Sequence, residues 1–212
     1  MEQYVKYPRS FHLPWSPGAT NDDKIMHDIS PFLGKTIVIT EKMDGENTTM
    51  YPDHIHARSI DSKDHDSRHW VKGLWGGIKN DIPDGWRICG ENLYAKHSLH
   101  YEDLSSYFMV FSIWNERNEC LCLNDTLDVC KMLNLTFVPI IDIITFDEKY
   151  LRNLAAKLDL NKTEGYVIRN VDSFGYDEFD INLAKWVREK HVTTDEHWMF
   201  QKTIPNKLIK YI

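Results

Sequence analysis

The sequence lacks any hydrophobic run long enough to cross a membrane, and residues 1–4 do not begin a signal-peptide pattern. It has only four cysteines, and the pair Cys120-x-Cys122 has no matching second pair at metal-ligand spacing. Its ten histidines include no HExxH motif, so a zinc site is not expected. These absences predict a cytoplasmic protein with reduced thiols and no membrane association.

An excess of basic residues is also missing. Lysine and arginine number 25 against 32 aspartates and glutamates, which gives a formal net charge of −7. A protein that coats nucleic acid non-specifically needs a broad basic surface, so this balance argues against that class. It leaves open a nucleic-acid enzyme with a local basic track and bound metal ions.

The chain contains enough apolar residues for one core, because 42% of its 212 residues are hydrophobic. We expect residues 1–212 to form a single domain, with residues 1–20 as an extended N-terminal segment and residues 191–212 as a short C-terminal tail. Three prolines between residues 4 and 18 disfavour helix in the first of these segments.

Short apolar runs, several of them rich in β-branched residues, predict strands at residues 36–40, 47–51, 54–58, 86–91, 107–114, 137–144, 164–169 and 181–188. Helical spacing and capping residues predict helices at residues 22–33, 67–80, 124–133 and 147–158, with Thr194 capping a final turn around residues 197–199. Strands dominate, and the helices do not alternate strictly with them. The predicted fold class is therefore α+β, with a mainly antiparallel sheet and flanking helices.

The stretch Glu41-Lys42-Met43-Asp44-Gly45-Glu46-Asn47 directly follows the first strand. Desolvation against the apolar strand disfavours the Lys42 ammonium, which would make this amine easier to deprotonate and more nucleophilic. Asp-Gly is also a common turn dipeptide, and a surface lysine before a hairpin turn is the alternative. Other strands end in residues of the kinds that hold phosphates or a hard cation, namely Arg58, Glu91, Glu164 and Lys185.

Together these segments resemble the covalent nucleotidyltransferases, the superfamily of polynucleotide ligases and mRNA capping enzymes. The run from Lys42 to Asn47 matches the K-x-D-G-x-N signature of that superfamily. Further motifs follow in the family's order between about residues 36 and 190: Arg58 in Ala57-Arg58-Ser59, the RNA ligase segment Gly90-Glu91-Asn92-Leu93-Tyr94-Ala95-Lys96, the apolar third motif around Phe111, Glu164-Gly165-Tyr166-Val167 and Ala184-Lys185-Trp186. The nearest resemblance is to ATP-dependent RNA ligases of the RNA ligase 2-like, nick-sealing type.

The resemblance implies a nucleotidyltransferase (ATP-grasp-like adenylation) domain and a role for each matched residue. Lys42, Lys185 and Asn47 would be catalytic. Glu164 and Glu91 would hold Mg²⁺ or Mn²⁺. ATP would be bound by Glu41, Arg58, Glu91, Phe111, Lys185 and Arg188. Asp44 would organise either the turn or the nearby solvent.

Two departures from the family pattern bear on these roles. Ser112 stands where the third motif usually carries an acid. Arg188 falls on the face opposite Lys185 unless a bulge intervenes, because side chains alternate along a strand.

Only 27 residues follow Lys185, and a sixth motif is missing, so we expect no appended OB-fold. This disfavours a full DNA ligase or a capping enzyme. We instead expect the N-terminal segment to cover the triphosphate, with Arg9 or His12 touching it.

The resemblance implies a reaction in three displacements at phosphorus. Lys42 attacks the ATP α-phosphate and becomes lysyl-AMP, the AMP moves to an RNA 5′-phosphate, and an RNA 3′-hydroxyl then expels AMP. The expected partners are RNA ends in nicked or duplex-like RNA, the expected state is a monomer, and the expected process is RNA repair. The alternatives are a DNA-nick ligase, a GTP-dependent capping-type enzyme, and a non-catalytic module that binds nucleotide or RNA ends.

Overall fold

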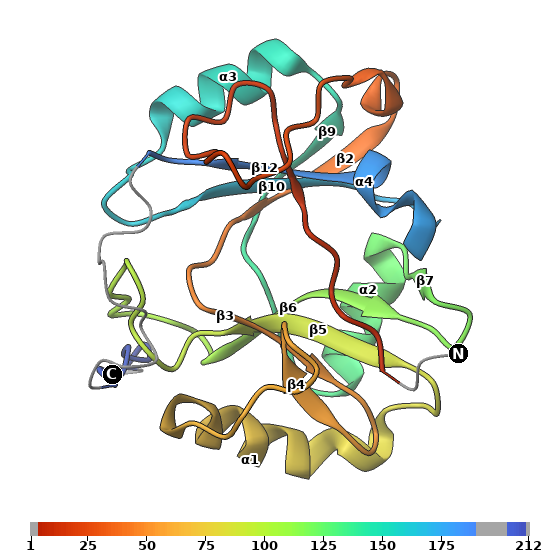
Figure 1. Cartoon of the computed structure of the whole chain (residues 1–212), viewed down its shortest axis with the longest axis vertical. Coiled ribbons are helices and arrows are strands. Elements are labelled where there is room, and N and C mark those ends of the chain that lie inside the picture. Colours follow the sequence, from red (N-terminus) through yellow and green to blue (C-terminus); the bar gives the residue numbers. More distant parts are fainter. Residues whose placement is uncertain (1–3, 190–202, 211–212) are drawn as a thin grey trace.

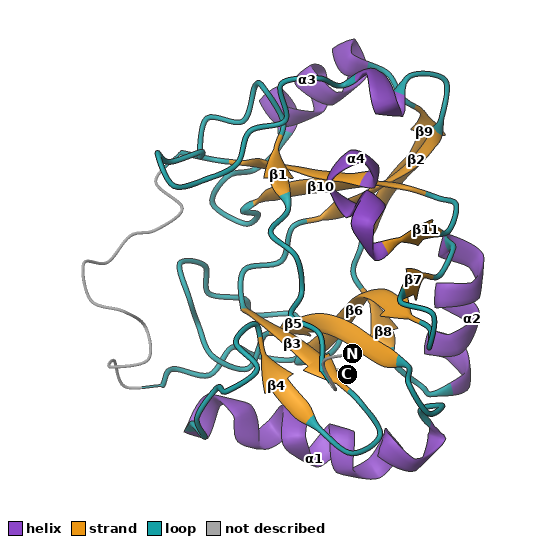
Figure 2. Ribbon diagram, turned by 45° about the vertical axis from the view of Figure 1, so that its right-hand side comes forward, coloured by secondary structure: helices purple, strands orange, loops and turns teal. Residues whose placement is uncertain are grey.

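The computed structural model describes residues 4–189 and 203–210. Two β-sheets lie one above the other, and helices cover their outer sides (Figures 1 and 2). The turn expected at Thr194 lies outside the described residues. Within the described ranges, no helix has the length and hydropathy that crossing a membrane would need.

The upper sheet contains five strands in the spatial order β1-β12-β10-β2-β9. Their bounds are β1 (Phe11–His12), β2 (Thr36–Glu41), β9 (Ile140–Thr145), β10 (Gly165–Asn170) and β12 (Leu183–Val187). Strand β10 pairs antiparallel with both β12 and β2, so the two motifs at residues 164–167 and 184–186 lie beside the strand that leads to Lys42.

The lower sheet contains seven strands, in the order β11-β7-β6-β5-β3-β4 with β8 beside β6. Their bounds are β3 (Glu46–Met50), β4 (Ile55–Ala57), β5 (Arg87–Asn92), β6 (Phe108–Trp114), β7 (Glu119–Cys120), β8 (Thr136–Phe137) and β11 (Phe174–Gly175). Only the pairs β1–β12 and β6–β8 are parallel among the described strands, which confirms the α+β class with mainly antiparallel sheets. These two sheets account for the strands of the described residues, and no separate OB-fold is among them.

Four α-helices are described: α1 (His69–Ile78), α2 (Leu123–Met132), α3 (Glu148–Lys157) and α4 (Phe179–Asn182). In Figure 1, α3 covers the outer side of the upper sheet and α1 that of the lower sheet. Helix α3 lies within the predicted range of residues 147–158. Its N-cap is Asp147, whose carboxylate accepts a hydrogen bond from Tyr150 N at 2.9 Å. Helix α2 begins at Leu123, one residue before the predicted start at residue 124, and its N-cap is Cys122.

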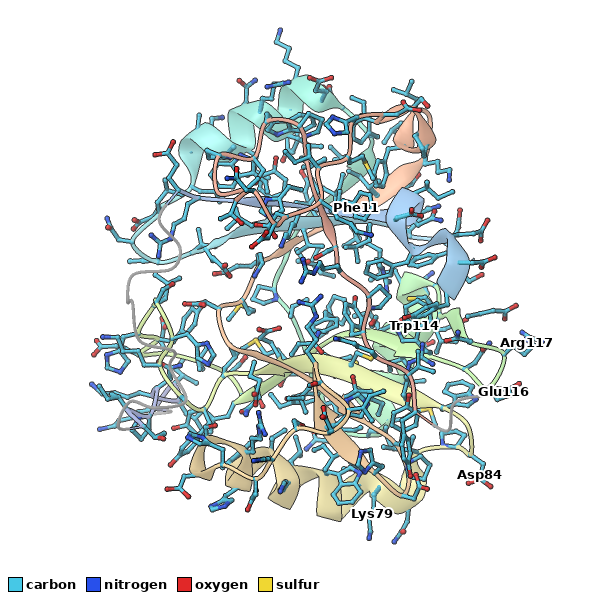
Figure 3. All side chains as sticks on the ribbon, viewed as in Figure 1. Phe11, Lys79, Asp84, Trp114, Glu116 and Arg117 are labelled. Carbon is cyan, nitrogen blue, oxygen red and sulfur yellow. The ribbon has the colours of Figure 1, made fainter. Side chains whose placement is uncertain are left out.

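Each sheet has its own apolar core on its outer side. Ile37, Ile39 and Ile168 pack toward α3, and Ile88 and Val110 pack toward α1 and α2. This leaves the facing sides of the two sheets for the site. Side chains fill the space between the layers, where Phe11 marks the upper sheet and Trp114 the lower one (Figure 3).

The helix predicted at residues 22–33 is wrong, and this part of the chain is mostly extended. His12 N donates to Lys24 O at 2.7 Å, and Met26 N donates to His12 O at 2.8 Å. These bonds to β1 satisfy backbone groups that a helix would otherwise have used. A single 3₁₀ turn remains, at Ser30–Phe32.

The strand predicted at residues 137–144 is split in two. The chain passes from β8 in the lower sheet to β9 in the upper sheet through Val138 and Pro139. Proline has no N–H to donate to a ladder, which suits a crossing point between sheets. The Pro139 carbonyl accepts a hydrogen bond from Glu41 N at 2.9 Å, so this crossing also supports the end of β2.

Candidate active site

A cavity of about 220 Å³ lies between the two sheets. Six of the predicted site residues line it: Glu41, Lys42, Asn47, Arg58, Glu91 and Phe111. Residues 7–10 of the N-terminal segment, including Arg9, form a further part of its wall. The structure therefore brings together residues that lie up to about 70 positions apart in the sequence.

Strand register explains which side chains of the upper sheet face the cavity. Val167 on β10 lies opposite Lys185 on β12 and Thr40 on β2. Because side chains alternate along a strand, the residues two positions from Val167 and Thr40, which are Arg169 and Val38, share the same face. The inner face of this sheet thus combines an apolar floor with cationic side chains.

The Lys42 side chain forms an ion pair with Glu164, the residue just before β10. Lys42 Nζ lies 2.6 Å from Glu164 Oε2, and the two side chains are 24% and 7% exposed. The backbone supports this pair, since Lys42 N donates to Gly165 O at 3.0 Å. The pairing of β2 with β10 is what places the amine and the carboxylate together.

The protonation state expected for Lys42 from the sequence is wrong for the ligand-free protein. Burial does lower the Lys42 pKa, but the nearby charges of Glu164, Glu91 and Asp44 outweigh it, and the pKa is raised above its usual value. Lys42 is therefore held as an ammonium. Burial acts on the Lys42 pKa in the predicted direction. The sequence motif did not show how many carboxylates surround this amine and reverse the net shift.

Glu91 is a second, partly buried carboxylate near Lys42. Its Oε1 accepts a hydrogen bond from Gly45 N at 3.2 Å. The pKa of Glu91 is raised to about 8: burial is the largest cause, Lys42 opposes it, and Glu164 and Asp44 add to it. A nearby cation stabilises the ionised form of a carboxylate whose pKa is raised. Mg²⁺ is such a cation, and it binds through one or two carboxylates together with substrate phosphates.

The protein supplies only some of the ligands that a bound metal ion would need. Among the described residues, no group of three or more His, Cys, Asp or Glu side chains is arranged to hold a metal ion by itself. Glu91 and Glu164 nonetheless fit a hard cation in charge and ligand type. An ion bound here would need further oxygen ligands from a substrate or from water.

Cationic side chains also lie near Lys42. Burial lowers the pKa of Lys185 to about 8, with Lys42 and Arg58 lowering it further and Asp23 and Glu164 opposing them. Burial also lowers the pKa of Arg58, with Arg9 adding to the effect. Cations that lower one another's pKa are short of negative charge, which an anionic ligand would supply.

Arg188 does not line the cavity, but Ser98 links its side chain to Asp44. Strand β12 ends at Val187, so the alternation that would have turned Arg188 away no longer applies. Its Nη2 donates to Ser98 Oγ at 3.3 Å, and Ser98 Oγ donates to Asp44 Oδ2 at 2.7 Å. Arg188 Nε is buried with no hydrogen-bond partner among the described residues.

Other predicted residues have distinct positions. Asn47 lines the cavity, and its Oδ1 is buried with no hydrogen-bond partner among the described residues. Ser112 is buried and accepts a hydrogen bond from Trp114 Nε1 at 3.1 Å, so it fills a structural position in the lower core. His12 lies within 2.9 Å of Ser16 Oγ and 3.5 Å of Asp23 Oδ1, where it anchors the N-terminal segment and does not line the cavity.

Arg169 also lines the cavity, although no sequence motif predicted it as a site residue. Its side chain is 4% exposed, and Nη1 donates to Cys120 Sγ at 3.5 Å. Its Nε and Nη2 have no hydrogen-bond partner among the described residues. Counting two positions along the predicted strand from Val167 would have placed this arginine on the cavity face. Tyr7 is a second cavity residue that was not predicted, and its ring meets the Phe111 ring edge-on with the centroids 5.0 Å apart.

Comparisons with solved structures give the same fold. An RNA ligase of Naegleria gruberi with pyrophosphate is 21% identical with a TM-score of 0.55, over 76% of this chain and 51% of that chain. A mutant of an RNA ligase from this organism with ATP and Mn is 18% identical with a TM-score of 0.56, over 89% and 61%. An archaeal ATP-dependent RNA ligase is 13% identical with a TM-score of 0.59, over 87% and 48%.

The chain thus spans about half the length of most of these ligases. No curated protein matches it significantly. The family model for RNA ligase matches residues 35–187. This range is most of the chain and includes all of the motifs between Lys42 and Trp186. The protein therefore belongs to the RNA ligase family.

Proposed function

We propose that this protein is an ATP-dependent RNA ligase that works through a lysyl-AMP intermediate on Lys42. The observation that carries the proposal is the position of Lys42, in a cavity between acidic and cationic groups. Glu164 lies 2.6 Å from its Nζ, and Glu91 and Arg58 line the same cavity. An amine, carboxylates and phosphate-binding cations within one cavity are what nucleotidyl transfer to lysine requires.

In the adenylation step, the cavity would hold the nucleotide between the two sheets. Phe111 from the lower sheet and Val167 from the upper sheet offer apolar faces for adenine. Glu41, which lines the same cavity, would accept a hydrogen bond from the exocyclic amine. The unpartnered Nε and Nη2 of Arg169 would donate to ring nitrogens, which are the acceptors of the base.

Lys42 must lose its proton before it attacks the α-phosphate. Glu164 Oε2, which accepts a hydrogen bond from Lys42 Nζ at 2.6 Å, would take up this proton. Glu164 and Glu91 would also hold Mg²⁺ or Mn²⁺, which when bound supplies positive charge to the phosphates. Lys185, Arg58 and Arg9 would stabilise the charge that builds up on the phosphate oxygens and the departing pyrophosphate.

The two later steps use the same residues on RNA. The AMP would move from Lys42 to the 5′-phosphate of an RNA end, and a 3′-hydroxyl would then displace AMP from that phosphate. The buried Oδ1 of Asn47 and the buried Nε of Arg188 lack partners among the described residues and are the free groups suited to the incoming end. We further infer a nicked or duplex-like RNA substrate, a monomeric enzyme and a role in RNA repair.

The test is covalent labelling. The protein is incubated with α-labelled ATP or GTP and Mg²⁺ or Mn²⁺, then denatured, and the label is counted in the parent and in Lys42→Met. We expect label from ATP in the parent and none in the variant. Label from GTP would favour the capping-type alternative. No label under any condition would leave only a non-catalytic binding module.

Substrate choice is read from sealing assays on nicked duplex RNA, single strands, RNA–DNA hybrids and nicked DNA. We expect the fastest sealing on nicked duplex RNA. Because the acidic chain offers only local cationic groups, we expect RNA affinity to fall steeply with added salt. Faster sealing of nicked DNA would instead support the DNA-ligase alternative.

A further inference from the structure

Residues 203–210, which we call the C-terminal strap, lie against the loop that joins β5 to β6. Asn206 of the strap is 1% exposed. Its Oδ1 accepts a hydrogen bond from Tyr101 N at 2.9 Å, and its Nδ2 donates to Leu93 O at 2.8 Å and Ala95 O at 3.2 Å. One buried side chain thus satisfies three backbone groups of a loop about 100 residues earlier.

The strap backbone strengthens this attachment. Five hydrogen bonds of 2.7 to 3.0 Å join it to the loop: Lys96 N to Ile204 O, Asn206 N to Tyr94 O, Lys207 N to Tyr101 O, Leu104 N to Lys207 O, and Ile209 N to Leu104 O. Isolated bridges between Ala95 and Pro205 and between Leu104 and Leu208 lie in the same place. The loop is therefore ordered by the strap at both of its ends.

The same loop holds the turn that carries the nucleophile. The Tyr101 hydroxyl accepts a hydrogen bond from Asp44 N at 3.0 Å. The Asp44 carboxylate accepts hydrogen bonds from Ser98 Oγ and Leu99 N, each at 2.7 Å. Asp44 lies two residues after Lys42, so a chain of direct contacts runs from Asn206 through Tyr101 to the nucleophile turn.

We propose that Asn206 is a positioning residue for the adenylation step, which holds Asp44 and thereby Lys42 in place through Tyr101. This inference rests on the proposed role of Lys42 as the AMP carrier. Asn206 does not touch the cavity, so its effect must pass through the loop. A small displacement of a reacting group lowers the rate of attack steeply, by roughly 100-fold per ångström.

The strap also gives Asp44 a definite role, which the sequence left open between turn and solvent. Both Nδ2 and Oδ1 of Asn206 bond to the loop, and an apolar side chain would leave Tyr101 N and two carbonyls without these partners. A buried polar residue with every group satisfied specifies one arrangement of the segments that it joins.

The experiment measures single-turnover adenylation of Lys42 in full-length Asn206→Ala, in Tyr101→Phe and in the double variant. We expect Asn206→Ala to lower the adenylation rate constant roughly 10- to 100-fold with little change in the KM for ATP. Tyr101→Phe removes only the hydroxyl and keeps the strap contacts, so it tests the link even if Asn206→Ala folds poorly. The double variant should be no slower than the slower single variant, because both act on one link.

Lys207→Ala is the matched control. Its side chain belongs to the strap but pairs with Glu102 on the surface, with the two side chains 60% and 68% exposed. We expect adenylation within about twofold of the parent. Amide hydrogen exchange adds a measurement that does not need activity: in Asn206→Ala, exchange at Asp44 and Leu99 should speed up while β5 and β6 stay protected.

Two results would overturn the proposal. One is an Asn206→Ala protein that adenylates at the parent rate per folded molecule with unchanged exchange at Asp44. The other is a double variant whose rate loss is the product of the single losses, because this would mean that Asn206 and Tyr101 act independently. A parent protein that never labels Lys42 would instead refute the ligase function itself, whatever the exchange experiment shows of the strap.

Discussion

Replacing Arg169 with methionine should make the ligand-free protein more stable and its binding of ATP weaker. The guanidinium is 4% exposed and forms no ion pair within the described residues. Its one hydrogen bond goes to Cys120 Sγ at 3.5 Å, a weak acceptor. Burial of this charge therefore costs free energy of folding. A bound nucleotide would reduce that cost by supplying hydrogen-bond acceptors, and an apolar side chain of similar length would remove it.

The two effects have different magnitudes. Replacing buried charged groups by packed apolar side chains stabilises proteins by about 1–4 kcal/mol. Arg169 also lines a solvent-accessible cavity, so we expect a gain in the lower half of that range, about 1–2 kcal/mol. Hydrogen bonds to charged groups contribute about 1.5–3 kcal/mol, so the loss of those to adenine should raise the Kd roughly 10- to 150-fold.

Urea unfolding and calorimetric titration with an α,β-methylene analogue of ATP measure the two effects separately, because the analogue cannot adenylate Lys42. Arg117→Met is the control, since Arg117 forms a surface pair with Glu119 and lies at the periphery of the molecule (Figure 3). It should change stability by less than about 0.5 kcal/mol and leave the analogue's Kd unchanged. If Arg169→Met loses stability, or binds the analogue as tightly as the parent, the assignment of Arg169 to the base is wrong.

Three further predictions concern the residues around the nucleophile. Lys42→Met should destabilise the metal-free protein by about 2–4 kcal/mol at pH 8 and by less at pH 5, measured by urea unfolding. The sign follows from Glu91, whose pKa in the folded protein is about 8, above its usual value, and rises further without Lys42. Stability therefore falls as the pH rises from about 4.5 toward 8. An equal loss of stability at both pH values would contradict this prediction. Gly165→Ala should cost at least about 2 kcal/mol and slow adenylation, because a Cβ there would overlap the Trp186 carbonyl oxygen; a parent-like melting temperature would show that the strands can separate locally. Arg9→Ala should raise the KM for ATP roughly tenfold because Arg9 lines the cavity, and a parent-like KM would remove the N-terminal segment from triphosphate binding.

The sequence predicted those parts of the fold whose signals are local. Strand β2 and helix α3 each carry a clear period and clear ends, and both were found within a residue or two of the prediction. The helix predicted at residues 22–33 failed because its backbone pairs with β1, a contact that no local pattern encodes. The long strand at residues 137–144 failed because one apolar run serves both sheets.

The candidate site was predicted by motif order, and its electrostatics were not. Motifs placed Lys42, Glu91 and Glu164 in one site but could not weigh burial against three nearby carboxylates, so the direction of the Lys42 pKa shift was wrong. Arg169 was missed because it belongs to no quoted motif, although strand alternation points it into the cavity. Asn206 could not be found at all, since its role depends on a contact across about 100 residues of sequence.

The carboxylates around Lys42 lead to a last prediction, on metal removal. With no divalent ion, the Glu164 carboxylate repels the triphosphate. It also holds the Lys42 ammonium in an ion pair, with Nζ and Oε2 2.6 Å apart. Glu164→Gln removes that charge and frees the ammonium, so in EDTA the variant should bind the ATP analogue more tightly than the parent. One charge several ångströms away, at the effective dielectric of a partly exposed site, is worth about 1–2 kcal/mol, or roughly 5- to 30-fold in Kd.

With Mg²⁺ present the order should reverse, because the parent keeps both carboxylates for the ion and the variant keeps only Glu91. Calorimetric titration in EDTA and in Mg²⁺ measures both cases, and Glu148→Gln on the outer surface of α3 is the control. A Glu164→Gln protein that binds more weakly in both buffers would show that Glu164 contacts the nucleotide directly. In that case the metal-binding role assigned to Glu164 would be wrong, because its carboxylate would bind the nucleotide and not a metal ion.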